Sequence, residues 1–435
     1  MRRSFVVVLA LAGSVRADPD PTIAAAKPDD ALASLLARTD AVAKEVARVR
    51  GLRLKKRIPN EVVDRAELKK RLLAEASEDK TAAQTAAHGL ALARWGLVPL
   101  DYDYSAQMID LLADQIAGYY DSKTKKLTIL DSAGSNAAWA EMVLAHELDH
   151  GLQDQAFDLE KFEKLPDDET DADLARHALV EGDGVALMIE VMLAREGVTQ
   201  PWSVPEAAAA VIQAMGEPEA KDSLDAAPLA IREEMLFPYR DGFGFVAALR
   251  RTRPWSAIDA AFRRPPRSSE QILHVDKYLA DEKPIAVIAG ASPLADYAVL
   301  TSETWGELGF HSFLATNGVN DEVANRAAAG WGGDRVLVLA KAGEKNPRRA
   351  IGVARFEWDR EIDAREAQAA LEHAVDAMTV GTFAQTMERT EWFALDGTVS
   401  WVERKDAGLV VVVGCPVQLA AKLDPWAMLA AKRKP

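Results

Sequence analysis

The sequence predicts an α+β protein in two parts, the first mainly helical with a small sheet, the second a smaller α+β domain with an antiparallel sheet. Stretches with helical spacing of apolar residues dominate up to about residue 286, whereas short β-branched segments between turn residues dominate from 287 onward. The chain has 435 residues, 49% of them hydrophobic and 27% charged, which is a globular composition long enough for two domains.

The first 17 residues have the three parts of a secretory signal peptide. Arg2 and Arg3 form a basic start, residues 5–13 form an apolar stretch, and residues 15–17 form a cleavage site. The apolar stretch is too short to span a membrane, and no later stretch approaches about 20 apolar residues. We therefore expect a bacterial protein that is exported to the periplasm or secreted, without stable membrane insertion after signal cleavage. An uncleaved anchor is the alternative.

The net charge indicates which partners to expect, and the cysteine content indicates the compartment. The formal net charge is −15, and removal of residues 1–17, which contain three arginines and no acid, would bring it to −18. A charge of this sign argues against nucleic acid or an anionic membrane as a partner. The single Cys415 lies in an apolar run, which indicates a buried thiol, and one cysteine in an exported protein fits a bacterial periplasm.

Elements of the first part follow from periodicity and turn residues. Residues 18–30 are predicted to be a flexible start, 31–50 and 66–76 helices, 53–63 an extended segment, and 118–132 a hairpin with a turn at 121–126. Two long helices are predicted at 136–157, capped by Asn136, and at 172–197, ending at Gly197, with an acidic surface loop at 163–173 between them. Helices with breaks at prolines continue to 279.

The second part, residues 287–435, is predicted to be a separate domain of unknown role. Strands are predicted at 335–340, 351–358, 391–395, 398–405 and 409–415, with a helix at 365–378 and another helix at the end of the chain. Asp396-Gly397 and residues 406–408 supply the hairpin turns.

The stretch VLAHELDHGLQDQ (143–155) contains the residues that predict a metal site. It holds two of the chain's 7 histidines, His146 and His150, on either side of Glu147. Residues four apart on a helix lie on one face, so both imidazoles can bind one ion while Glu147 lies beside them. Zinc accepts such ligands tetrahedrally and activates a water, whose proton Glu147 can accept as general base. The alternative is a solvated helical face without metal.

A catalytic zinc site needs a third protein ligand. The metzincin pattern would place glycine and histidine where this chain has Gln153 and Ala156, so that pattern is excluded. Glu181 lies in the apolar run HALVEGDGVALM, where an unpaired carboxylate is costly and a metal would resolve the cost. His177, one turn earlier, is the rival ligand. Glu181 as an acid at an exposed helix edge is the alternative.

HELDHGLQDQ followed by ALVEGD resembles the gluzincin group of zinc metallopeptidases, with its thermolysin-like pair of helices, and in particular the bacterial peptidase-MA-like branch. The resemblance covers roughly residues 50–280 and implies zinc at His146, His150 and Glu181, with hydrolysis of peptide bonds. It also implies a strand beside the active-site helix that pairs with extended substrate, for which LTILDS (127–132) is the candidate.

The chain departs from the thermolysin-like pattern at one position. An acid is usual four residues after the ligand glutamate, and here that position holds Val185, which puts catalytic efficiency in question more than metal binding. Asp183 is a candidate to orient a ligand histidine through a hydrogen bond, or else a solvated acid.

A peptidase also needs a donor that stabilises the oxyanion formed at the scissile carbonyl. We assign His274, in SSEQILHVDKY, to this catalytic role, because gluzincins often use a downstream histidine or tyrosine. Tyr278, Tyr119 and Tyr120 are the alternatives, and packing or surface exposure is the ordinary role for all four.

The sequence therefore predicts a signal peptide (1–17), a gluzincin-like zinc peptidase domain (18–286) and the second domain (287–435). The expected function is an exported metallopeptidase that hydrolyses peptides or proteins through a zinc-activated water, with Glu147 as general base. A catalytically inactive binding or structural module is the main alternative, and a hydrolase of non-peptide bonds is another. Glu147 separates these hypotheses, because a binding module needs no general base.

Overall fold

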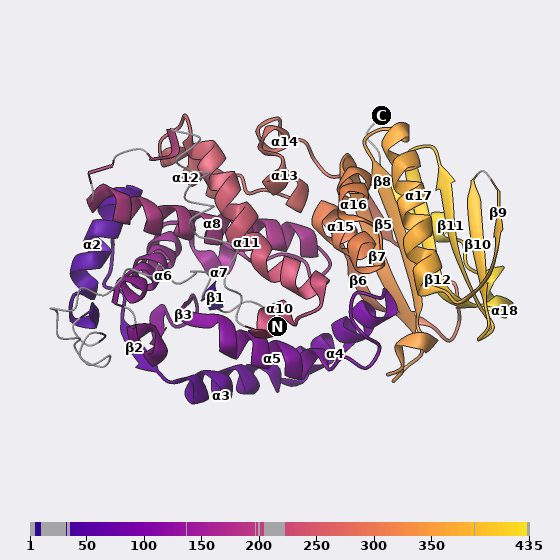
Figure 1. Ribbon diagram of the computed structural model, residues 1–435, viewed down its shortest axis with the longest axis horizontal. Coiled ribbons are helices and arrows are strands. Elements are labelled where there is room, and N and C mark those ends of the chain that lie inside the picture. Colours follow the sequence, from indigo (N-terminus) through magenta and orange to yellow (C-terminus); the bar gives the residue numbers. More distant parts are fainter. Residues whose placement is uncertain are drawn as a thin grey trace.

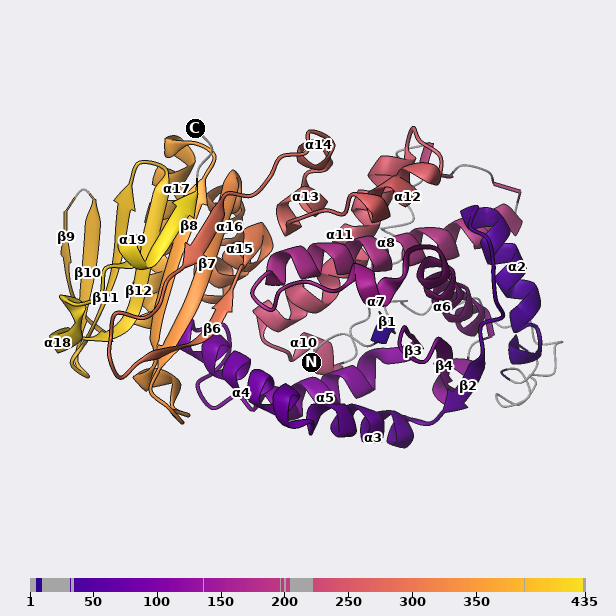
Figure 2. The same cartoon turned by 180° about the vertical axis from the view of Figure 1, so that it is seen from behind.

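The computed structural model describes residues 5–9, 32, 35–135, 137–195, 197–198, 201–203, 222–386 and 388–432. It confirms the α+β prediction, with a mainly helical first part and a second part built on an antiparallel sheet (Figures 1 and 2). The predicted flexible start at 18–30, the predicted cap Asn136 and most of the predicted signal peptide lie outside these residues. No helix within the described ranges is long and apolar enough to cross a membrane.

The first part contains the predicted hairpin and the two predicted long helices. Its strands are β1 (Phe5–Leu9), β2 (Asn60–Val63), β3 (Ile116–Asp121) and β4 (Lys126–Leu130). Its helices are α2 (Thr39–Arg50), α3 (Arg65–Ala76), α4 (Asp79–Arg94), α5 (Tyr104–Gln115), α6 (Ala137–Phe157), α7 (Leu159–Phe162), α8 (Thr170–Arg195), α10 (Asp222–Asp225), α11 (Leu229–Arg250), α12 (Ser256–Arg263), α13 (Ser269–Leu273) and α14 (Val275–Leu279). Two 3-10 turns are η1 (Asp131–Ser135) and η2 (Pro201–Ser203).

The four strands form one sheet in the order β1-β3-β4-β2. β3 is antiparallel to both β1 and β4, whereas β2 runs parallel to β4. Because side chains alternate along a strand, Tyr120 and Leu127 pack in the core that contains α6, while Tyr119 and Leu130 pack against α3 and α5 on the opposite face. The sheet thus supports α6, the helix with both histidines.

Helix α8 packs against both α6 and α11. It approaches α11 closely because glycines face each other. A Cβ on Gly182 would lie 2.2 Å from the carbonyl carbon of Gly242, and a Cβ on Gly242 would lie 2.1 Å from the carbonyl oxygen of Ala178. The glycines therefore set how closely α8 lies to α11.

The second part is a seven-stranded antiparallel sheet in the order β6-β7-β8-β12-β11-β10-β9. Its strands are β6 (Ala298–Glu303), β7 (Trp331–Ala340), β8 (Ile351–Trp358), β9 (Gly381–Gln385), β10 (Arg389–Ala394), β11 (Thr398–Lys405) and β12 (Gly408–Pro416). Its helices are α15 (Gly306–Thr316), α16 (Asp321–Ala328), α17 (Glu361–Met378), α18 (Val417–Ala420) and α19 (Pro425–Met428), with a 3-10 turn η3 (Pro347–Arg349).

The last described element corrects one prediction. A helix is expected at the end of the chain, but after α19 the backbone forms strand β13 (Leu429–Lys432), which pairs with β5 (Ala286–Ala289). This pair covers the sheet face that also buries Cys415, as predicted for that thiol. Burial raises the pKa of Cys415 to about 11, which keeps it an unreactive thiol.

The two parts share a hydrophobic core. Trp95, which ends α4, packs with Trp305 and Phe313 at ring distances of 5.3 and 5.9 Å. A Cβ on Gly352 of β8 would lie 2.8 Å from the Trp95 ring, so the indole lies directly on the second sheet. The helices α15, α16 and α17 cover the same face (Figure 1).

Candidate metal centre

Helices α6 and α8 bring together the four residues for which zinc chemistry is predicted. Oε2 of Glu181 lies 3.0 Å from Nε2 of His146 and 3.4 Å from Nε2 of His150. One ligand atom each of His146, Glu147 and His150 lie within 4.8 Å of one another. All four residues are fully buried. Residues 35 positions apart in the sequence thus form one compact donor set.

The two separations from Glu181 can be compared with those between ligands of a tetrahedral zinc ion. With bonds of about 2.0–2.1 Å from zinc to nitrogen or oxygen, neighbouring ligand atoms are separated by roughly 3.3 Å. The separations of 3.0 and 3.4 Å between Glu181 Oε2 and the two imidazole nitrogens are close to that value. Two histidines and a glutamate are also the ligand set of a catalytic zinc site that keeps one position open.

The protonation states also suit metal ligands. Burial, together with the neighbouring His150, lowers the pKa of His146 to about 4, so its imidazole is neutral at pH 7. Burial alone would raise the pKa of Glu181, but its contacts with His150 and His146 hold that pKa below the usual range. A neutral imidazole and an ionised carboxylate are the forms that bind zinc.

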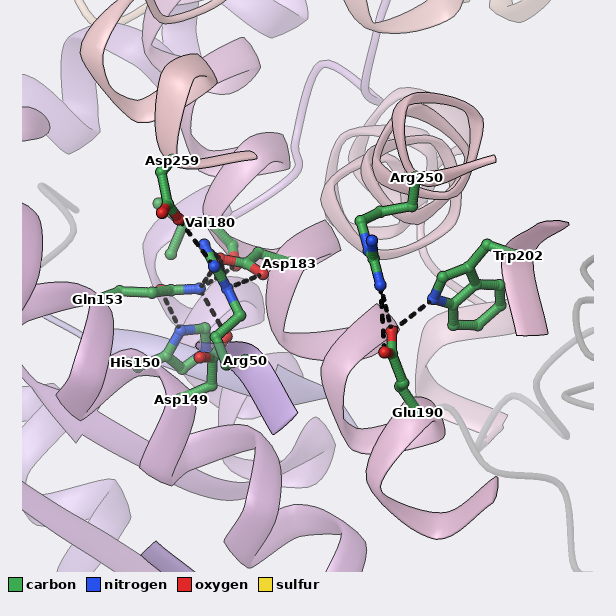
Figure 3. A network of polar contacts seen from close by, with 10 residues as sticks. All are labelled: Arg50, Asp149, His150, Gln153, Val180, Asp183, Glu190, Trp202, Arg250 and Asp259. Carbon is green, nitrogen blue, oxygen red and sulfur yellow. Dashed lines mark hydrogen bonds and ion pairs between the residues drawn. The ribbon is translucent and has the colours of Figure 1, made fainter. Parts of the chain in front are cut away.

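Behind His150 lies a network of buried polar side chains (Figure 3). Nδ1 of His150 is 2.9 Å from Oε1 of Gln153. Nε2 of Gln153 donates to Oδ2 of Asp149 at 2.9 Å, to Oδ2 of Asp183 at 3.0 Å and to the carbonyl oxygen of Val180 at 3.1 Å. Asp183, a candidate to orient a histidine, therefore reaches His150 through Gln153.

Arg50 completes this network from α2 (Figure 3). Its Nε and Nη2 donate to Asp183 at 2.8 to 3.1 Å, and its Nη1 donates to Asp259 at 2.8 Å. The guanidinium is fully buried and lies 4.6 Å from the ring centre of Trp255. A buried cation thus balances the carboxylate that holds Gln153.

Sequence reasoning missed the roles of Gln153 and Arg50. Gln153 lies on the same helix face as His150 at a spacing of three, so the spacing could have indicated a contact. Arg50 is 133 positions from Asp183 and no local pattern connects them. Val185, at the position where thermolysin-like enzymes have an acid, is a buried core residue.

Glu147 lies against β3. A Cβ on Gly118 of that strand would be 3.4 Å from Cγ of Glu147. The outer edge of β3 pairs with residues 5–9, in the register Val7 to Tyr119. The expectation that LTILDS (127–132) pairs with extended substrate is wrong, because its strand β4 is already paired on both sides, by β3 and β2.

His177 provides a further imidazole beside the donor set of His146, Glu147, His150 and Glu181. Its Nε2 lies 3.7 Å from Oε1 of Glu181, one helical turn away, and its side chain is 13% exposed. It is therefore placed between the buried donor set and the surface.

The residues considered for the oxyanion have partners outside this cluster. Nε2 of His274 lies 3.0 Å from Oε1 of Glu307 on α15, and Arg71 donates to the hydroxyl of Tyr119 at 3.0 Å. The other two tyrosines donate, Tyr120 to Asp154 at 2.8 Å and Tyr278 to the carbonyl of Arg264 at 2.9 Å. The structure does not bring His274 together with the four clustered residues.

A cleft of about 720 Å³ opens where β3 ends. Ser122 and Lys123 of the hairpin turn line it, together with α4, residues 160–170 and the edge strand β6. Acids predominate among its charged residues, which are Lys123, Glu160, Glu163, Lys164, Asp167, Asp168, Glu169, Asp173 and Glu303.

A second group of acids, Glu270, Glu282 and Asp359, also has metal-like spacing. The ammonium group of Lys277 donates to all three at 2.6 to 2.7 Å. The lysine supplies the positive charge there, so we assign no metal to this group.

Comparison with known proteins adds one match. Residues 297–424 match the model of a family described as a domain of unknown function (DUF8575). These residues lie within the second part and exclude the donor set on α6 and α8. Neither the curated proteins nor the solved structures gave a match.

Proposed function

We propose that this chain is a zinc-dependent metallopeptidase in which His146, His150 and Glu181 hold the ion. The observation that carries the proposal is the position of Glu181 Oε2, 3.0 Å from one imidazole nitrogen and 3.4 Å from the other, inside a fully buried site. Two histidines alone would bind many ions weakly, whereas an added carboxylate at these separations matches a catalytic zinc site. We propose in addition that the protein acts after export and removal of residues 1–17.

Zinc in such a site lowers the pKa of water to about 7 and polarises a carbonyl group. Glu147, one residue after His146, accepts the proton of the attacking water and passes it to the leaving amine. The outer edge of β3 supplies main-chain groups for an extended polypeptide, as it does for residues 5–9. His177, near Glu181 and partly exposed, is better placed than His274 to stabilise a developing negative charge.

The test uses the chain from Asp18 onward and measures two quantities, the zinc content by mass spectrometry and the cleavage of a denatured protein. The proposal expects about one zinc per chain and measurable cleavage. Glu147→Gln should keep the zinc and lose cleavage, whereas Glu141→Gln, a half-buried position on the same helix, should keep both.

The outcomes separate the hypotheses. Wild type that binds no zinc, even after reconstitution, contradicts the proposal. Wild type that binds zinc but cleaves no polypeptide favours a binding module built on a peptidase fold. Unchanged cleavage in Glu147→Gln would remove Glu147 from the mechanism.

A further inference from the structure

We propose that Gln153 is a positioning residue that fixes the tautomer of His150, so that Nδ1 carries the proton and Nε2 keeps its lone pair. Nε2 is the atom that faces Glu181, at 3.4 Å from Oε2. That a zinc ion binds there rests on the proposed function. The proton on Nδ1 does not, because it follows from hydrogen bonds within the chain.

The orientation of the Gln153 amide is the first step. Three oxygen acceptors surround one end of the amide, from Asp149, Val180 and Asp183, at 2.9 to 3.1 Å. Only the NH2 end of an amide donates, so this end must be Nε2. With the amide reversed, its oxygen would face the carbonyl oxygen of Val180, which can only accept, and the carboxylate of Asp183, which already accepts from Arg50. Oε1 must therefore face His150.

The tautomer follows from this orientation. Oε1 of Gln153 lies 2.9 Å from Nδ1 of His150, and an amide oxygen can only accept. Nδ1 of His150 must then be the donor, and a neutral imidazole that is protonated at Nδ1 has its lone pair at Nε2. Nε2 makes no hydrogen bond of its own within the described residues.

Arg50 holds one of these acceptors, Asp183, in place. Two of its nitrogens hold Asp183, and its third nitrogen donates to Asp259. Glutamate at position 153 would direct a carboxylate at the carbonyl oxygen of Val180 and at the carboxylate of Asp183, and neither has a hydrogen to donate. Glutamine is therefore a residue type that can donate to these acceptors through its two N–H groups and accept from His150 through its oxygen, which distinguishes this site from the usual carboxylate partner of a ligand histidine.

The first measurement is NMR of the metal-free wild-type chain from Asp18, labelled with 15N at histidine, at pH 8. Long-range proton–nitrogen correlations tell the two tautomers apart, and the His150 signals are identified by their loss in His150→Gln. The proposal expects His150 protonated at Nδ1. Protonation at Nε2 instead would overturn it. This measurement needs neither zinc nor activity.

The second measurement is the zinc dissociation constant by chelator competition. Gln153→Met keeps the length of the side chain without donors or acceptors, and should weaken zinc binding by about 10- to 100-fold and lose the Nδ1–H preference. Gln155→Met, two residues later on α6 and outside this network, should match the wild type. Folded Gln153→Met with wild-type affinity and an unchanged tautomer would overturn the proposal.

Failure of this proposal differs from failure of the proposed function. Wild type that binds no zinc yet shows the Nδ1–H tautomer of His150 contradicts the zinc peptidase and supports the role of Gln153. Wild type that binds zinc but carries the His150 proton at Nε2 supports the zinc site and contradicts the role of Gln153.

Discussion

The ring of His146 lies directly against the backbone of Gly184. A Cβ on Gly184 would be 2.8 Å from Cε1 of His146 and 3.0 Å from each ring nitrogen. Real Cβ atoms do not approach other atoms this closely, because interiors are packed to contact with little room to yield. Glycine at 184 is therefore part of the candidate metal centre, although it binds nothing.

Gly184→Ala should displace the His146 ring and weaken zinc binding, by an amount on the order of 10-fold. Gly244→Ala on α11 is the matched control, because among the described residues no atom beyond its chain neighbours and its own helix backbone lies within 4 Å of its added Cβ. It should keep the zinc affinity and raise stability by up to about 1 kcal/mol. Chelator competition measures the affinities, and equal values for the two variants would contradict the packing argument.

Glu181→Ala should abolish retention of zinc during dialysis against a chelator, because it removes the only carboxylate assigned as a ligand. Glu190→Ala lies on the same helix and removes a carboxylate that pairs with Arg250 and Trp202 instead. It should lower stability but leave the zinc content at that of the wild type. Undiminished zinc affinity in Glu181→Ala would move the third ligand to His177.

Acid should remove the stabilising contribution that neutral His146 makes to the metal-free protein. Its pKa is about 4 in the folded chain and about 6.5 in the unfolded chain, so the unfolded chain takes up a proton first as the pH falls. The contribution of His146 to stability is then lost between about pH 6.5 and pH 4, with roughly 2 kcal/mol of that contribution lost between pH 7 and pH 5. Urea unfolding at both pH values checks this, and His146→Gln should show a smaller difference. The same difference in both proteins would rule His146 out as the cause.

Arg50→Met should lower the free energy of unfolding by about 3–5 kcal/mol, because it leaves the buried carboxylate of Asp183 without its cation. Arg57→Met removes an exposed pair with Asp40 and should cost less than about 1 kcal/mol. Denaturant unfolding of the two variants gives the comparison. Similar small losses would mean that Asp183 changes its protonation state at little cost.

Removal of residues 1–17 should increase peptide binding and cleavage, because residues 5–9 pair with the edge of β3 beside Glu147. The full chain and the chain from Asp18 would be compared with the same denatured protein substrate. Equal rates would show that the substrate does not use this edge of β3.

Several features followed from local sequence alone, because they depend on spacing along one element. The four-residue spacing of His146 and His150 places both imidazoles on one helix face, whatever the rest of the chain does. A polar turn between a short strand and a β-branched second strand predicted the hairpin at 118–132, and apolar surroundings singled out Glu181. The change from helical to alternating patterns near residue 287 predicted the second sheet.

Tertiary structure decided everything that joins distant segments. It placed Arg50 against Asp183 and Gly184 against His146, and it directed His274 to Glu307. It also placed β4 between β3 and β2, which is more than 60 positions away, so β4 has no free edge. Such contacts depend on how helices and strands pack, and a residue's neighbours along the chain carry no information about a partner supplied by another element.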